Sequence, residues 1–189
     1  MKTLIKLAAL TLLLTLSSQS QADLMTLSGD GDYNGSVLSD NGWASNNSGA
    51  GEVDFWTFSL AQDIKMSVLV TSDIVFGVSL YAGEILTDPE YNFSNYASFD
   101  GLFGETLDYV AGSDPFTPLS GNSLSDIMLT AGTYTLALGG NDLGFDMFGE
   151  YQYLLNISSQ AVADVPEPEM ALLMLVGVAG LMLQRKRIS

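Results

Sequence analysis

Residues 54–60 read Asp-Phe-Trp-Thr-Phe-Ser-Leu, and this stretch indicates the fold class. Trp56, Phe58 and Leu60 fall on one face of an extended chain, and Phe55, Thr57 and Ser59 fall on the other. Such alternation of large apolar and polar residues is the pattern of a strand with one buried face. Residues 54–60 are therefore predicted to form a β-strand against a hydrophobic core.

The same alternation recurs and predicts a domain built of sheets. Further strands are expected at residues 24–27, 66–71, 74–81, 133–138 and 151–157. Gly, Asp and Asn fill the connections, as is typical of antiparallel strands joined by turns, and no segment between residues 23 and 164 keeps a helical period. Each set of strands has an apolar face, so the prediction is all-β: an antiparallel, jelly-roll-like β-sandwich of two packed sheets.

Two segments interrupt this pattern. Residues 28–51 are crowded with Gly, Ser, Asn and Asp, and we expect turns there around at most one short strand near Val37. Residues 84–126 are rich in aromatic and acidic residues, and we expect a long excursion with one or two short strands. Its aromatic side chains are expected to pack in the core or against one another. An exposed platform on which sugars stack is the alternative.

Composition limits the chemistry open to this chain. It has no Cys and no His, which excludes disulfides, thiolate metal sites and Ser-His-Asp catalysis. Residues 23–164 contain twenty Asp and Glu and one basic residue, Lys65, so their formal charge is −19. Binding to nucleic acid or to an anionic membrane surface is not expected, because both need clustered Lys and Arg. Cations, or polymers bridged by cations, are the natural partners, unless the acids serve solubility alone.

The first 22 residues have the order of a secretory signal peptide. Lys2 and Lys6 precede an apolar run at residues 7–16, and small residues precede a cut between Ala22 and Asp23. As a helix the apolar run rises about 15 Å, against about 30 Å for the hydrocarbon core of a bilayer. This disfavours the alternative, an uncleaved anchor. We therefore expect cleavage by signal peptidase during export through the inner membrane.

The last residues, 165–189, combine a proline-rich motif, an apolar segment at residues 170–183 and a basic end. The motif is Val165, Pro166, Glu167 and Pro168, and the basic end is Arg185, Lys186 and Arg187. The prolines favour an extended, accessible segment. The apolar segment rises about 21 Å as a helix, short of a comfortable span. The basic end is expected to stay cytoplasmic.

This tail resembles the PEP-CTERM sorting signal in the order of its parts and in its terminal position. The resemblance covers residues 165–189. It implies recognition by a membrane exosortase, cleavage near Pro166–Pro168, and release or attachment of the domain at the surface. Such systems are typical of Gram-negative bacteria that make exopolysaccharide. A plain C-terminal membrane anchor is the alternative.

Two phrases inside the predicted sandwich resemble those of small exported β-domains. Residues 52–60 read Glu-Val-Asp-Phe-Trp-Thr-Phe-Ser-Leu, and residues 129–136 read Leu-Thr-Ala-Gly-Thr-Tyr-Thr-Leu. Both are similar to strands of bacterial pre-peptidase C-terminal-like domains and of FxDxF-type PEP-CTERM proteins. Glu52 stands where the first Phe of the strict FxDxF pattern would be. The resemblance implies a small exported β-sandwich.

Oxygen-bearing side chains at alternate positions suggest a cation site. Asp30, Asp32 and Asn34 open a stretch like the start of an EF-hand calcium loop. The closing Glu is absent: its position is Asn41, with Asp40 just before it. Asp30, Asp32, Asn34 and Asp40 are therefore the candidate calcium ligands, and a solvated turn is the alternative. Residues 139–146 form a second acidic, Gly-rich loop, which is either a hairpin connection or a further cation site.

The functional prediction is a non-catalytic protein placed at the cell surface or in extracellular polysaccharide, without a required cofactor. Its expected parts are a signal helix at residues 1–22, an acidic sandwich at 23–164 and a sorting signal with a hydrophobic helix at 165–189. One alternative is a calcium-assisted carbohydrate-binding module that uses Asp30, Asp32 and Asn34 with the aromatic residues of 91–116. Another is a polysaccharide hydrolase acting through paired carboxylates, for which no motif is present.

Overall fold

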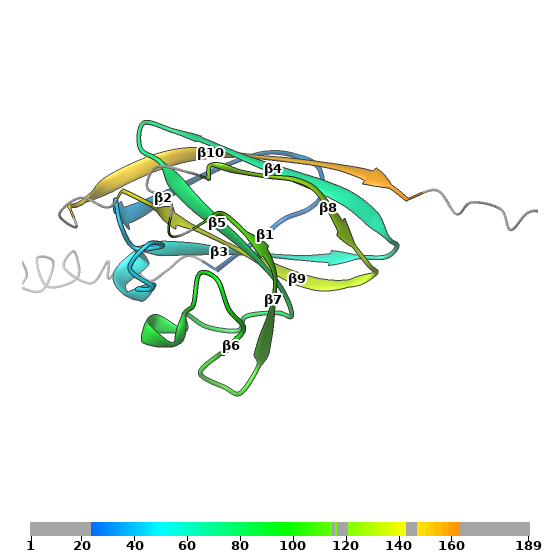
Figure 1. Cartoon of the computed structure of the whole chain (residues 1–189), viewed down its shortest axis with the longest axis horizontal. Helices are drawn as coiled ribbons and strands as arrows, with labels where there is room; N and C mark the ends of the chain where they lie inside the picture. Colours follow the sequence, from blue (N-terminus) through cyan, green and yellow to red (C-terminus); the bar gives the residue numbers. More distant parts are fainter. Residues whose placement is uncertain (1–23, 115, 117–120, 143–146, 163–189) are drawn as a thin grey trace, which may run out of the picture.

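The computed structural model of the chain describes residues 24–114, 116, 121–142 and 147–162, which fold as two packed β-sheets (Figure 1). The strands are β1 (Leu24–Thr26), β2 (Gly31–Ser39), β3 (Val53–Leu60), β4 (Ile64–Ser72), β5 (Phe76–Ala82), β6 (Phe99–Asp100), β7 (Thr106–Gly112), β8 (Ser123–Leu129), β9 (Gly132–Gly140) and β10 (Phe148–Ala161). Two short 3-10 helices, η1 (Gly49–Gly51) and η2 (Glu90–Asn92), lie in loops. The prediction of an all-β, two-sheet domain is confirmed. The flanking helices expected at residues 1–22 and 170–183 lie outside the described residues.

The larger sheet has the strand order β1-β3-β9-β5-β7-β6. β9 runs antiparallel between β3 and β5, so that Leu136 pairs with Trp56 on one side and with Leu80 on the other. β1 confirms the strand expected at residues 24–27, but it runs parallel to β3, contrary to the prediction of a wholly antiparallel fold. The larger sheet is thus antiparallel at its centre and has one parallel edge.

The smaller sheet has the order β2-β10-β4-β8 and is antiparallel throughout. β10 is its longest strand and lies between β2 and β4, with Leu155 paired to Tyr33 and to Val70. The ladder to β4 continues as far as Ala161, beyond the end of the ladder to β2. The last residues of β10 are therefore paired on one side alone.

The main hydrophobic core fills the space between the two sheets. Apolar side chains enter it from alternate positions of the facing strands, as a sandwich requires. They include Trp56, Phe58, Met66, Val68, Val70, Val78, Leu80, Leu136, Leu138, Leu155 and Ile157. Burying each large apolar side chain contributes about 1.5–3 kcal/mol, so this layer is the principal source of stability. The predicted inward face of residues 54–60 is confirmed.

A second core covers the outer face of the larger sheet. The loop before η1 packs over this face, and so do parts of residues 83–122, which connect β5 to β8 and are here called the excursion. β6 and β7, also in the excursion, extend the larger sheet and project from the sandwich in Figure 1. Buried aromatic rings join the layers, among them Trp43, Phe55, Tyr81, Phe93 and Phe99. Burial raises the pKa of the Tyr81 phenol far above its usual value. Both faces of the central strands are therefore covered.

Trp43 shows why this packing needs glycine in the sheet. A Cβ on Gly77 would come within 2.0 Å of the Trp43 ring. The ring nitrogen donates a hydrogen bond to Ser79 Oγ at 2.9 Å, so the buried indole is also satisfied. Gly77 therefore lets the indole lie directly on β5.

Two segments depart from the expectations. Residues 31–39, expected to be mainly turns, form the nine-residue β2. The Asn, Asp and Gly residues of this segment favour turns, and the strand was therefore not predicted. It is stabilised by its ladder to β10 and by the edge-on contact of Tyr33 with Trp56, at 5.5 Å between ring centroids. Residues 84–126, expected to contain one or two short strands, contain β6, β7 and part of β8. Tertiary pairing outweighed local propensity in each case.

Candidate functional site

The proposed calcium-binding stretch is a strand rather than a binding loop. Asp32 and Asn34 are alternate residues of β2, and both are exposed on the outer face of the smaller sheet. Asp32 Oδ1 accepts a hydrogen bond from Asn156 Nδ2 of β10 at 2.6 Å. The Asp32 carboxylate therefore serves a cross-strand contact instead of converging with its neighbours on a cation.

Asp30 and Asp40 lie at opposite ends of β2. Asp30 Oδ2 accepts the backbone N–H of Ser159 at 3.0 Å, and Asp40 Oδ1 accepts that of Met147 at 2.8 Å. A nine-residue strand separates the two aspartates, a length of about 30 Å. The four predicted calcium ligands are thus not brought together. Within the described ranges, no group of three acidic, His or Cys side chains could hold a metal.

Asp40 lies in a different acidic neighbourhood. Asp142 N–H donates to Asp40 O at 2.9 Å. Partial desolvation, followed by the charges of Asp40 and Asp142, raises the pKa of Tyr151. Asp146, the other acid of the second predicted loop, lies outside the described residues.

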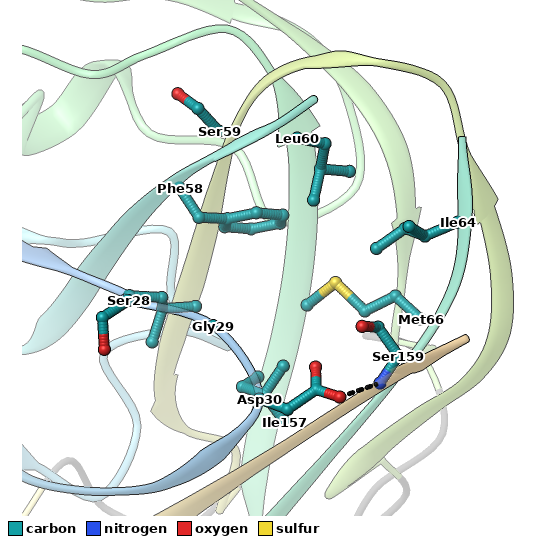
Figure 2. A pocket seen from close by; sticks show the side chains of 11 residues that line it. Ser28, Gly29, Asp30, Phe58, Ser59, Leu60, Ile64, Met66, Ile157 and Ser159 are labelled. Atoms are coloured by element: carbon teal, nitrogen blue, oxygen red, sulfur yellow. Dashed lines mark hydrogen bonds between the residues drawn. The ribbon is translucent and has the colours of Figure 1, made fainter. Parts of the chain in front are cut away.

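A pocket of about 140 Å³ opens at the end of the sandwich where β10 finishes (Figure 2). Its wall is apolar and is formed by side chains of β3, β4 and β10 and of the β1–β2 connection. The apolar lining residues are Leu27, Phe58, Leu60, Ile64, Met66 and Ile157. Asp30 stands at the mouth, where its carboxylate holds the Ser159 backbone. The pocket is the size of a single small ring or branched aliphatic group.

The chemistry of this pocket does not suit hydrolysis. Asp30 is the single titratable residue in its lining, beside Ser28, Ser59 and Ser159. Glycoside hydrolysis needs two carboxyl groups set across the scissile bond. The pocket therefore offers a hydrophobic contact with one acceptor at its rim, and it lacks the pair that the hydrolase alternative requires.

Asp54, which was not among the predicted site residues, is buried between the sheets. Tyr153 of β10 donates its hydroxyl to Asp54 Oδ2 at 2.6 Å, and Trp56 Nε1 donates to Tyr153 Oη at 2.8 Å. Asp54 is two residues before Trp56 and falls on the same face of the strand, so its burial could have been predicted. The contacts explain a structural role: they join β3 to β10 through the core.

The aromatic residues of the excursion divide into two sets. Phe93 and Phe99 are buried in the second core, as the main expectation held. Tyr91, Tyr96, Phe103 and Phe116 are exposed, as the platform alternative required. Tyr96 and Phe116 contact each other edge to face, with 5.5 Å between ring centroids. The excursion therefore anchors itself with one set and presents the other to solvent.

The residues of export and sorting lie outside the described residues. These are Ala22 and Asp23 at the signal-peptide cut, Val165, Pro166, Glu167 and Pro168 of the sorting motif, and Arg185, Lys186 and Arg187 of the basic end. In the part of the chain that is described, no helix is long and apolar enough to cross a bilayer.

Comparison with known proteins gives matches to solved structures alone: no family model and no curated protein matches the chain. The pre-peptidase C-terminal domain of a Bacillus anthracis collagenase is 17% identical, with a TM-score of 0.40, over 72% of this chain and 95% of that domain. CorA, a surface-associated copper-binding protein of Methylomicrobium album BG8, is 8% identical, with a TM-score of 0.46, over 74% and 99%.

A third match is PliG of Aeromonas hydrophila, a periplasmic inhibitor of g-type lysozyme. It is 10% identical, with a TM-score of 0.39, over 73% of this chain and 98% of PliG. Each of these TM-scores is below 0.5, so the likenesses carry nothing about what this chain binds or does.

Proposed function

We propose that this chain is an exported, non-catalytic protein of the cell surface or extracellular matrix. Signal peptidase removes residues 1–22, and the tail holds the precursor in the inner membrane until an exosortase cuts near Pro166–Pro168. The observation that carries the proposal is the order of the tail: a proline-rich motif, an apolar segment too short for a comfortable span, and a basic end.

The positions of the described strands are compatible with processing at both ends. All ten strands, from β1 to β10, lie between the proposed signal-peptide cut and the sorting motif. Val162 N–H donates to Asp63 O at 3.1 Å, just after β10. Removal of both end segments would therefore leave every described strand in place.

A non-catalytic role is supported by the chemistry of the described surface. The chain has neither His nor Cys, and the pocket in Figure 2 has a single carboxylate at its mouth. Asp54 is buried and engaged with Tyr153, away from any substrate. These features fit an interaction or matrix role, with exopolysaccharide as the proposed neighbour of the mature domain.

Substitution of the sorting motif tests this function. In cells of the native type, changing Pro166, Glu167 and Pro168 together to Ala should leave tail-bearing protein in the inner-membrane fraction, detected with an antibody against the sandwich. The matched control is Glu169→Ala, which changes an adjacent acid outside the motif and should sort normally. Surface delivery of the triple variant at the level of the unchanged chain would contradict exosortase processing.

A carbohydrate-binding role is the second candidate, and the exposed aromatic residues of the excursion favour it. Its calcium-assisted form lacks a convergent ligand set among Asp30, Asp32, Asn34 and Asp40. The exposed aromatic side chains of the excursion therefore support binding of a polysaccharide without a metal ion.

A further inference from the structure

The exposed aromatic side chains of the described chain are concentrated in the excursion. Tyr91, Tyr96, Phe103 and Phe116 are 50–82% exposed there, and Phe148 on β10 is the fifth such residue. Large aromatic rings are usually withdrawn from water, and a gathering of exposed ones marks a place of contact. These four residues belong to the excursion, whose strands β6 and β7 project from the sandwich in Figure 1.

The excursion is fixed to the sandwich by a chain of edge-to-face ring contacts. Phe55 of β3 contacts Phe93, Phe93 contacts Phe99, and Phe99 contacts Tyr81 of β5, with centroid distances of 5.1–5.8 Å. The exposed rings are therefore mounted on an anchored support. Such preorganisation reduces the ordering cost of binding.

The tip that carries Phe103 is held by the Glu105 carboxylate. Its oxygens accept the backbone N–H groups of Leu86 at 3.1 Å and of Phe103 at 3.0 Å. Desolvation opposes ionisation of Glu105, but backbone hydrogen bonds outweigh it and lower the pKa of this carboxyl. Gly101 leaves room for the carboxylate, because a Cβ there would lie 2.2 Å from Glu105 Cδ. These contacts thus hold the backbone of the turn at Phe103.

Charge limits what can dock on these rings. Residues 84–116 contain seven acids and no Lys or Arg; the acids are Glu84, Asp88, Glu90, Asp100, Glu105, Asp108 and Asp114. An anionic polymer, an anionic membrane or a second copy of this −19 domain would be repelled. A ligand that combines apolar faces with positive charge is complementary to this surface.

We propose that the excursion binds an amino-sugar polymer, a polysaccharide that carries free amines. The apolar faces of its pyranose rings stack on Phe103 and on the Tyr96–Phe116 pair, and its ammonium groups face the carboxylates and the aromatic rings. Separate rings along one segment suit a repeating chain better than they suit a compact protein partner. The inference rests on the proposed function solely for bringing the domain to the matrix.

Calorimetry with defined oligosaccharides tests the proposal, using the full chain in a non-ionic detergent. The probe is the β-1,4-linked glucosamine hexamer, and the fully N-acetylated hexamer is its neutral counterpart. We expect the amine form to bind, and the neutral form to bind at least tenfold more weakly. Tyr96→Ala with Phe116→Ala, and separately Phe103→Ala, should each weaken binding by about tenfold. Phe148→Ala, an equally exposed ring on β10, is the matched control and should bind as the unchanged chain does.

Three results would overturn the proposal: no heat with the amine hexamer, equal binding of the two hexamers, or equal losses for Phe103→Ala and Phe148→Ala. The substituted side chains are exposed, and unchanged circular dichroism would show that the variants remain folded. Because this experiment uses purified protein, its failure would leave proteolytic sorting untouched, and a sorting failure would not alter the binding result.

Discussion

Tyr153 reaches across the core from β10 and has polar partners on the opposite sheet. Its hydroxyl donates to Asp54 and accepts from the Trp56 indole, and both partners belong to β3. The alternation of residues 54–60 could have placed Asp54 on the same face as Trp56. It could not name the partner, because Tyr153 is distant in sequence and the offset between the sheets depends on the whole packing. The predicted calcium site was wrong because it too depended on tertiary structure. The spacing of the four residues resembled a binding loop, but Asp30 and Asp40 lie at opposite ends of a strand.

Removing one hydroxyl tests this buried contact. Tyr153→Phe should lower the free energy of unfolding by about 1–3 kcal/mol, because Asp54 and Trp56 would each lose a partner away from water. Tyr151→Phe in the same strand removes an exposed hydroxyl that donates to Met147 O, and it should cost less than about 0.5 kcal/mol. Urea denaturation measures both values. Equal losses for the two variants would contradict the role assigned to Tyr153.

Whole strands were predictable where large side chains alternate and less so elsewhere. β3, β4, β9 and β10 carry clear apolar faces and were expected close to their observed positions. β2 was underestimated because Asp32 and Asn34 occupy its exposed positions, because glycines flank Tyr33 on its other face, and because its stability comes from the neighbouring β10. The parallel pairing of β1 with β3 depends on which distant segments lie side by side, and the hydrophobic periodicity of the sequence does not predict this. The excursion's division into buried and exposed aromatic residues likewise follows from contacts with the outer face of the larger sheet.

The anchoring of the excursion can be separated from that of the sandwich. Phe99→Ala removes a buried ring between Phe93 and Tyr81, and we expect backbone amides of β6 and β7 to lose protection in hydrogen exchange. Amides of β3 and β9, which lie at the centre of the larger sheet, should keep most of theirs. Val110→Ala, an exposed position of β7, is the control and should leave both regions protected. Equal loss of protection in all four strands would contradict a separately anchored excursion.

At the scale of the whole molecule, the composition, the positions of the strands and the two end segments all fit an exported domain that is processed at both ends. A cysteine-free domain with a formal charge of −19 is held together by two sheets and a second aromatic core, without disulfides. The described strands, β1 to β10, lie between the two proposed cleavage sites. The two end segments are each apolar over a length that falls short of the hydrocarbon thickness, which favours processing over permanent anchorage.

The intact mass of the protein recovered from the surface of native cells tests this central claim most directly. The account predicts a chain that begins at Asp23 and has lost the apolar segment 170–183 and the basic end that follows it. A mass that corresponds to all 189 residues would contradict it.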